Sequence, residues 1–103
     1  MIVQFVSFES SLPESEVLKV AQDRIEAFRA LPGLLQKTYV KLPEPNRYGG
    51  IYLWDSIESM KAFRESDLAA TIPLAYKVVG APKIEIMEAM FQLRETKRLM
   101  EAE

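Results

Sequence analysis

Hydrophobic residues alternate with polar ones, or run together, in four short segments of the chain. Such runs, bounded by glycine, proline and polar residues, are typical of β-strands. The segments run from Ile2 to Phe8, from Leu34 to Leu42, from Tyr48 to Trp54 and from Lys83 to Leu93. Apolar side chains fall on both faces of these segments, so the sequence predicts a sheet that is covered on both sides.

A helical spacing separates the first two predicted strands. Apolar residues there recur at intervals of four, four and three positions: Val17, Ala21, Ile25 and Phe28. This spacing predicts a helix of about four turns with one apolar stripe. Ser11 to Glu14 resembles a capping box at its start, and Leu31-Pro32-Gly33 ends it because proline cannot continue a helix.

A second helix is predicted after the third strand. Asp55 is the expected N-cap, with Glu58 three residues later. The buried side of this helix is expected to carry Ile57, Met60 and Phe63. Residues 66–80 have no clear periodicity, and Pro73 predicts that no continuous helix runs through them.

The predicted order of elements is strand, helix, strand, strand, helix, strand. Right-handed crossovers turn this order into an α+β, ferredoxin-like βαββαβ fold, a four-stranded antiparallel sheet with both helices on one face. Residues 1–93 form this domain, and residues 94–103 form a charged C-terminal tail for which a short helix is expected. The chain is 103 residues long, which suits one domain.

The sheet face opposite the helices is expected to be apolar as well. An exposed apolar face of that size indicates a partner. A second copy of the chain, packed sheet against sheet about a twofold axis, is the simplest solution. We therefore expect a homodimer.

Composition removes several classes of function. The chain has no histidine and no cysteine, which excludes Ser-His-Asp and Cys-His catalysis and leaves no ordinary zinc site. A net charge of −2 without long runs of one sign argues against nucleic acid as a partner. No apolar run reaches the roughly 20 residues of a membrane span, and a cytoplasmic location is expected.

The segment RYGGIYLW, residues 47–54, admits two interpretations. It resembles the third strand of RNA-recognition domains, whose aromatic rings stack on bases. However, Gly49 and Ile51 stand where those rings belong. We therefore do not expect RNA binding.

The second interpretation follows from the alternation of side chains along a strand. Gly49, Ile51 and Leu53 should face the partner sheet, whereas Tyr48, Gly50, Tyr52 and Trp54 should face the helices. A gap at Gly50 beside these rings predicts space for a flat ligand. The alternative is that Tyr52 and Trp54 simply fill the core, with Gly50 allowing a helix to approach.

Two stretches resemble the dimeric α+β barrel superfamily: PGLLQKTYV at residues 32–40 and GGIYLWDSIESMKAF at residues 49–63. The resemblance is greatest to the YdhR-like mono-oxygenases, relatives of the antibiotic-biosynthesis monooxygenases. It implies a homodimer with a pocket between sheet and helices in each subunit. It also implies oxidation of phenols or anthrones by O2 without flavin, haem or metal.

The same resemblance speaks against haem degradation. Haem-degrading relatives use a tryptophan late in the second helix and a histidine ten residues later. Phe63 and Pro73 stand at those positions here. The resemblance to the cofactor-free monooxygenases thus implies that no cofactor is needed.

Cofactor-free oxidation needs a dry pocket, a proton acceptor and a group that holds an anion. Glu85 and Glu88 interrupt the last apolar strand, on opposite faces, and are candidate bases; alternatively they are charges that protect a sheet edge. Arg64 is a candidate for holding an anion, or else part of a solvated helix face.

Other polar and aromatic residues are candidates for substrate binding. Tyr39, Tyr52 and Tyr76 can stack on a flat ligand and offer hydroxyl groups, or fill the core. Trp54 is expected to stack on the ligand beside Gly50, and Gln4 to bind a carbonyl or neighbouring backbone.

The apolar segment 68–80 is expected to cover the pocket mouth as an irregular lid or a dimer contact. The sequence thus predicts a cofactor-independent mono-oxygenase that acts on a small or polycyclic aromatic compound. A non-catalytic dimer that binds a small molecule is the alternative. The two are distinguished by a proton acceptor in contact with the ligand.

Overall fold

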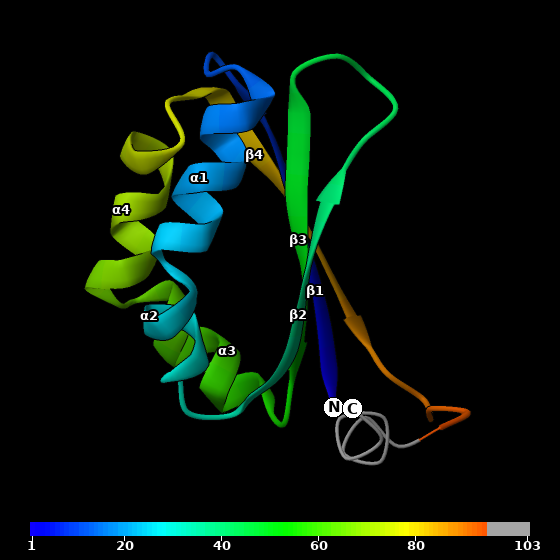
Figure 1. Cartoon of the computed structure of the whole chain (residues 1–103). Coiled ribbons are helices and arrows are strands. Elements are labelled where there is room, and N and C mark those ends of the chain that lie inside the picture. Colours follow the sequence, from blue (N-terminus) through cyan, green and yellow to red (C-terminus); the bar gives the residue numbers. More distant parts are fainter. Residues whose placement is uncertain (95–103) are drawn as a thin grey trace.

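The computed structural model describes residues 1–94 as two layers, a sheet and a set of helices on one of its faces (Figure 1). The elements follow in the order β1 (Ile2–Ser10), α1 (Glu14–Asp23), α2 (Ile25–Arg29), β2 (Leu34–Lys41), β3 (Arg47–Trp54), α3 (Ile57–Arg64), α4 (Asp67–Ala75) and β4 (Val78–Glu88). The tail expected at residues 94–103 lies, but for its first residue, outside this range.

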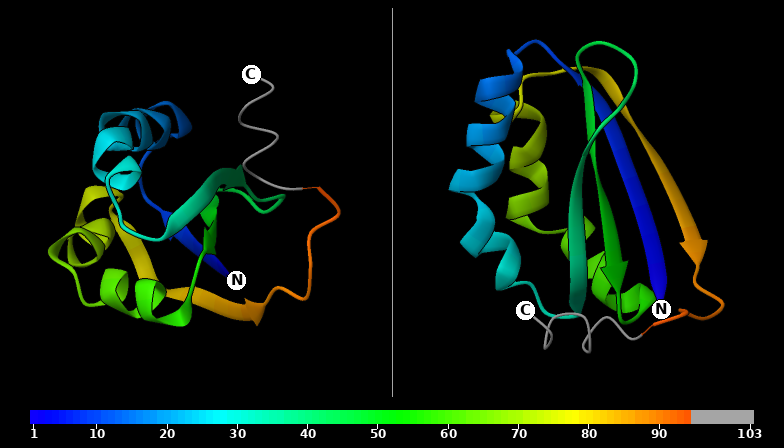
Figure 2. Two further views of the ribbon diagram at one scale, coloured as in Figure 1. Left: turned by 90° about the horizontal axis from the view of Figure 1, so that it is seen from below. Right: turned by 45° about the vertical axis from the view of Figure 1, so that its right-hand side comes forward.

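The four strands form one antiparallel sheet in the order β2-β3-β1-β4. This is the ferredoxin-like order, so the predicted fold class is confirmed. The strands lie side by side in Figure 2, with β2 and β4 at the edges. The register pairs Gln4 with Tyr52 and Ile86. Since partners in register share a face, these three side chains point toward the helices.

The first helical region differs from the prediction of one helix. Arg24, with φ −108° and ψ 4°, separates α1 from α2. The capping box is also wrong, because Pro13 occupies the N-cap position and α1 has no side-chain cap. Ser11 instead donates a hydrogen bond to the backbone oxygen of Lys77, at 3.3 Å, and so joins the start of α1 to the end of α4.

The second helical region consists of two helices as well. Ser56, and not Asp55, caps α3, since its hydroxyl accepts a hydrogen bond from the backbone N–H of Ser59. The segment that we expected to be irregular contains α4, and Pro73 lies inside this helix. Proline has no backbone N–H and so removes one hydrogen bond from the helix. The disturbance is limited because α4 ends two residues later, at Ala75.

The last strand is displaced from its predicted position. It begins at Val78 and ends at Glu88 instead of spanning Lys83 to Leu93. The sequence signal was obscured at its start by Gly80, whose φ is +72°, and by a register shift between Ser7 and Glu9 on β1. Beyond β4 the backbone N–H of Ala89 still bonds to the oxygen of Met1, at 2.9 Å, after which pairing stops.

The core lies between the sheet and the helices in two clusters. One surrounds Phe8 and Tyr76, and the other surrounds Trp54, Met60 and Phe63. Met60 and Phe63 are buried as the helical spacing predicts, but Ile57 is 41% exposed because it lies in the first turn of α3. These clusters occupy the two ends of the helix-covered face and leave space between them.

The sheet face without helices is partly apolar. Phe5 and Ile51 are register partners on it, and the half-exposed Met87 follows on β4. Gly49 lies beneath the ring of Phe5 on this face; a Cβ there would lie 3.3 Å from a carbon of that ring. Across residues 1–94, none of the helices has the length and hydropathy needed to cross a bilayer.

Candidate active site

A cavity of about 240 Å³ lies between the sheet and the helices, mainly under α4. Because both edge strands contribute to its wall, it crosses the helix-covered face of the sheet. Most of its lining is apolar. The lining residues from the helices include Phe63, Arg64, Ala69, Ile72 and Pro73. Segment 68–80 therefore contributes to the cavity wall, mostly as helix α4.

The aromatic floor of the cavity is held by a buried tryptophan. The rings of Tyr52 and Trp54 are parallel within 4°, with centroids 5.9 Å apart, and Phe63 packs against both. Trp54 is completely buried and is not part of the cavity wall, whereas Tyr52 is. Trp54 therefore supports Tyr52 from behind, which corresponds to the core-filling alternative for this residue.

Gln4 fixes the polar end of this floor. Its Oε1 accepts a hydrogen bond from Nε1 of Trp54, at 3.0 Å. Since the indole nitrogen only donates, the amide oxygen of Gln4 must face Trp54. The amide nitrogen of Gln4 is therefore left to donate hydrogen bonds elsewhere. Within residues 1–94, no fully buried side-chain polar atom lacks a partner. The Nε2 of Gln4, which has no hydrogen bond to the described residues, therefore opens into the cavity that Gln4 lines.

Lys37, on β2, reaches into the cavity through a cage of aromatic rings. Its Nζ lies 3.5 Å from the ring centroid of Phe28, 4.3 Å from that of Tyr39 and 4.7 Å from that of Tyr52. Among the described residues its amine has neither an ion pair nor a hydrogen bond. It also borders a second hollow, under α2, that Phe28 and Tyr39 share.

This environment makes Lys37 an amine that loses its proton easily. Burial, aided by the positive charge of Arg24, lowers the pKa of Lys37 from its ordinary value of 10.5 to about 7. The faces of the surrounding rings attract the ammonium form and oppose this shift. Desolvation without a counter-ion is the larger effect, so a substantial fraction of Lys37 is neutral at pH 7.

The tyrosines of the cavity have the opposite character. Burial raises the pKa of Tyr76 to about 12 and that of Tyr52 further, while the pKa of Tyr39 is raised less. All three hydroxyl groups therefore stay protonated at neutral pH and can donate hydrogen bonds. A proton acceptor and neutral donors thus face the same space.

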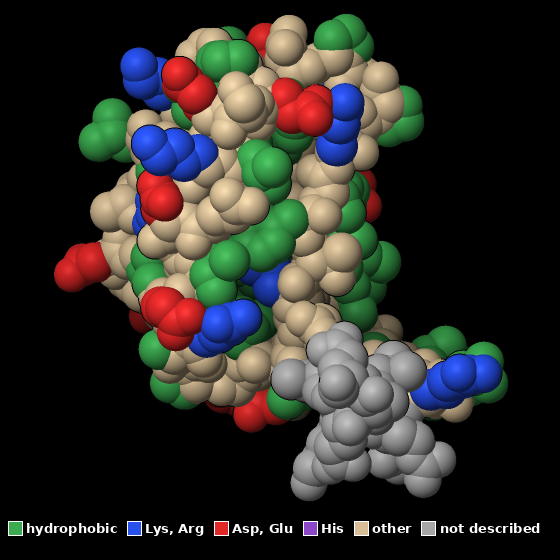
Figure 3. Space-filling view, viewed as in Figure 1, with side chains coloured by type: hydrophobic (Ala, Val, Ile, Leu, Met, Phe, Trp, Pro, Cys, Tyr) green, Lys and Arg blue, Asp and Glu red, His purple; other side chains and the backbone are tan. Residues whose placement is uncertain are grey.

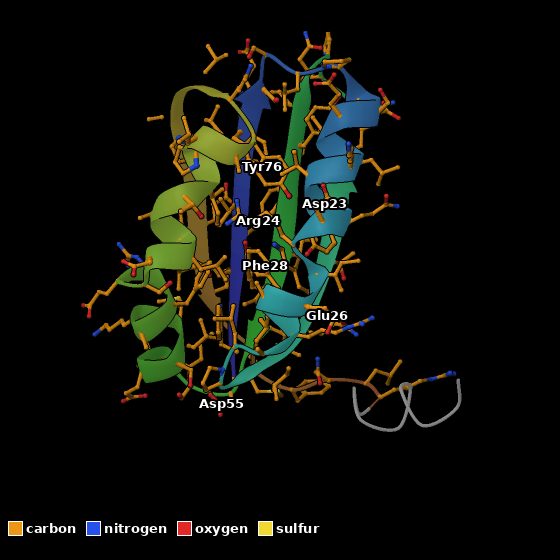
Figure 4. The ribbon with its side chains drawn as sticks, turned by 60° about the vertical axis from the view of Figure 1, so that its left-hand side comes forward. Asp23, Arg24, Glu26, Phe28, Asp55 and Tyr76 are labelled. Atoms are coloured by element: carbon orange, nitrogen blue, oxygen red, sulfur yellow. The ribbon has the colours of Figure 1, made fainter. Side chains whose placement is uncertain are left out.

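Arg24 connects the two pairs of helices above the site. Its guanidinium donates hydrogen bonds to the backbone oxygen of Leu68 and to the hydroxyl of Thr71 on α4. Figure 4 shows Arg24, Phe28 and Tyr76 in the gap between the helices, while Glu26 points away from it. The charge of Arg24 adds to the effect of burial on the pKa of Lys37, whereas it partly opposes the rise that burial causes in the pKa values of Tyr39, Tyr52 and Tyr76.

Gly50 provides the room that Lys37 occupies. A Cβ at this position would lie 3.0 Å from Cε of Lys37 and 3.1 Å from a ring carbon of Tyr52. The space expected beside Gly50 is therefore present, but the stem of a lysine runs along it. Figure 3 shows a basic side chain set back among hydrophobic ones in the hollow between helices and sheet.

The comparisons with known proteins identify the family. Residues 2–97 match the family described as "Putative mono-oxygenase ydhR". The chain belongs to the ydhR family. The predicted resemblance is thereby confirmed. A search of the curated proteins found no match.

Solved structures similar to this ydhR-family chain share its fold. SnoaB, a cofactor-independent oxygenase from Streptomyces nogalater, has a TM-score of 0.71 at 19% identity, over 91% of this chain and 98% of that one. A monooxygenase from the ActVA-Orf6 gene of Streptomyces coelicolor, in complex with Nanaomycin D, has a TM-score of 0.69 at 20% identity, over 91% of each chain. NE2512 from Nitrosomonas europaea, a protein of unknown function, has a TM-score of 0.72 at 18% identity, over 91% and 93% of the two chains.

Two of the catalytic candidates lie away from the cavity of this ydhR-family subunit. Glu85 faces the sheet surface without helices, where it pairs with Lys83 at 3.3 Å, and Glu88 is exposed at the end of β4. Neither lines the cavity. Arg64, the third candidate, does line it, from the last position of α3.

The sequence analysis did not single out Lys37. The substrate-binding candidates Gln4, Tyr39, Gly50, Tyr52 and Tyr76 all line the cavity together with it. In residues 1–94 no three Asp or Glu residues cluster as potential metal ligands.

Proposed function

We propose that this ydhR-family protein is a cofactor-independent mono-oxygenase that acts on a small aromatic compound with an acidic C–H or O–H group. The observation that carries the proposal is Lys37, a half-buried residue whose amine lies among aromatic rings of the cavity and has no counter-ion within residues 1–94. A base with a pKa near the working pH is the most effective acceptor of a proton. The family and the shared fold agree with this assignment.

The proposed reaction starts when neutral Lys37 removes a proton from the bound substrate. The hydroxyl groups of Tyr52 and Tyr76 and the amide of Gln4 donate hydrogen bonds to the oxygen on which the negative charge develops. Their undissociated state suits this task, because an ionised phenol would repel the anion. The apolar wall limits water, which would otherwise stabilise the anion and slow its oxidation.

The electron-rich anion is itself the reductant of O2. For an anthrone methylene group, two C–H bonds break and one oxygen atom enters as a carbonyl. The second oxygen atom leaves as water, reduced by the electrons of the substrate. The volume of about 240 Å³ is below the roughly 300 Å³ at which pockets for drug-sized ligands begin, which favours a small substrate over a large polycyclic one.

Oxygen consumption tests the proposed function. Protein treated with a chelator, with no flavin absorption, is expected to speed O2 uptake by a small anthrone or quinol above the spontaneous rate. The rate should rise as the pH passes about 7, because Lys37 must lose its proton first. A substrate that binds in the cavity but is not oxidised at any pH would instead support the non-catalytic binding dimer.

We further propose that the protein is a cytoplasmic homodimer that packs through the helix-free sheet face. The exposed apolar residues Ile51 and Met87 support this, since burying them would remove apolar surface from water. Sedimentation equilibrium at micromolar concentration is expected to give twice the 11.8 kDa mass of one chain. A folded monomer under these conditions would contradict the dimer.

A further inference from the structure

The charged groups that line the cavity are all positive. Lys37 and Arg64 belong to its wall, and no aspartate or glutamate among residues 1–94 does. Arg24 adds a third positive charge close enough to alter the pKa values of the residues around it. The whole chain, by contrast, has a net charge of −2. The cavity is therefore a positive site in a slightly negative protein.

The uncharged polar groups of the wall add donors. The amide oxygen of Gln4 is used by Trp54, so only its N–H2 group is offered to a ligand. Burial keeps Tyr52 and Tyr76 protonated. Apart from the tyrosine hydroxyl oxygens and the neutral form of Lys37, the wall side chains of residues 1–94 offer no free hydrogen-bond acceptor. A matching ligand must be rich in acceptors.

Arg64 is available to bind such a ligand. Its guanidinium has no ion pair and no hydrogen bond with any residue in the described range 1–94, although it is exposed at the end of α3. Lys37 comes from β2, an edge strand, whereas Arg64 comes from the helix layer. The amine and the guanidinium therefore approach the cavity from different elements, with an apolar stretch that includes Val6 and Ile72 in the same wall.

We propose that the substrate is an aromatic carboxylic acid whose carboxylate binds Arg64 at the cavity mouth while its ring lies in the apolar interior beside Lys37. This inference rests on the proposed function and specifies its substrate class. A guanidinium matches a carboxylate through two parallel hydrogen bonds, which fixes direction as well as affinity. The ring then enters first and presents its acidic group to the amine.

A neutral aromatic compound would fit this wall less well. It would leave Arg64 without a partner and would cover the guanidinium partly from water, at a cost in desolvation. An anion removes that cost, because the guanidinium exchanges water for a charged partner. Complementary charge should therefore decide between two ligands of the same shape.

Isothermal titration calorimetry with two matched compounds tests the inference. 2-Naphthoate and 2-naphthamide have the same ring system and nearly the same shape, but only the first is an anion. Wild-type protein at neutral pH is expected to bind the naphthoate at least tenfold more tightly, as for roughly one charge-assisted hydrogen bond. Equal affinity, tighter binding of the amide, or no binding of either compound would overturn the proposal.

Two variants of α3 locate the carboxylate. Arg64→Gln is expected to weaken naphthoate binding roughly tenfold to hundredfold and to leave naphthamide binding nearly unchanged. Lys61→Gln is the matched control, because Lys61 is exposed in the last turn of the same helix and does not line the cavity. It should keep the preference for the acid. An unchanged preference in Arg64→Gln would refute the assignment.

The failure of this inference is distinguishable from failure of the proposed function. If O2 uptake occurs but acids and amides bind equally, the enzyme is an oxygenase for neutral compounds and the inference is wrong. If Arg64 selects the acid but no anthrone or hydroxynaphthoate is oxidised, the carboxylate site stands and the oxygenase does not.

Discussion

Replacing Lys37 by methionine is expected to lower the rate of substrate-dependent O2 uptake by roughly 10²–10⁴, the usual contribution of a general base. Methionine preserves most of the length and the apolar stem of the side chain but cannot accept a proton. The aromatic cage of Phe28, Tyr39 and Tyr52 should therefore stay packed. The measurement is the rate in an oxygen electrode at saturating substrate.

The pH dependence separates a base from a residue that only packs. In the wild type, kcat/KM, which reports the pKa of the free enzyme, should rise through the pKa of Lys37 at about 7 and then level off. In Lys37→Met this rise should vanish. Lys41→Met is the control, since Lys41 lies on the same strand but is exposed and pairs with Glu14. Full activity and an unchanged pH profile in Lys37→Met would remove the lysine from the mechanism.

Stability provides an independent reading of the same group. Between about pH 7 and the ordinary lysine value of 10.5, the unfolded chain binds a proton at Lys37 that the folded chain lacks. The free energy of unfolding should therefore gain a positive slope with pH from Lys37 in this window. The methionine variant should lack this slope. Its gain in stability over the wild type should be largest below pH 7, where the wild type has to bury a charged Lys37.

Replacing Trp54 by alanine is expected to lower the free energy of unfolding by about 3–5 kcal/mol. Trp54 is completely buried, stacks on Tyr52 and contacts Phe63. A loss of this size is a large part of the 5–15 kcal/mol typical of small proteins. Urea unfolding followed by circular dichroism measures it, and Leu74→Ala, at a residue that is 83% exposed, should have little effect.

The hydrogen bond of Trp54 can be tested separately from its volume. Trp54→Phe retains a ring but leaves the Oε1 of Gln4 without its donor, at a cost of roughly 1–3 kcal/mol. A further change of Gln4→Leu should recover part of that loss, because both polar partners are then gone. If Trp54→Ala costs less than Trp54→Phe, the buried tryptophan does not support the floor as described.

Alternation along the strands predicted the fold well because it reports local geometry. Tyr48, Tyr52 and Trp54 face the helices as the pattern indicates, and Ile51 faces away. The order of elements then restricts the topology to very few arrangements. The ends of the elements were harder to predict than whether each is a helix or a strand. Gly80 and a register shift concealed the start of β4, and Arg24 divides a helical region whose apolar spacing is continuous.

The candidate site was predicted in part for the same reason. Gln4, Tyr52 and Gly50 are on the helix face by alternation, so their presence in the cavity wall follows from local pattern. Lys37 does not stand out, because a lysine in QKTYVK is typical of an exposed edge strand. Its burial depends on the register of β2 against β3 and on Phe28 from α2. The glycine at position 50 predicted a gap in the strand, but it did not show that Lys37 fills this gap.

The close approach at Gly50 has an evolutionary consequence. A Cβ at position 50 would lie 3.0 Å from Cε of Lys37, so a side chain there requires the stem of Lys37 to shift. Neither residue can change alone without loss, since a larger residue at 50 expels the amine and a shorter one at 37 leaves a void. We therefore expect positions 37 and 50 to change together among members of this family, with glycine at position 50 wherever a lysine is kept at position 37.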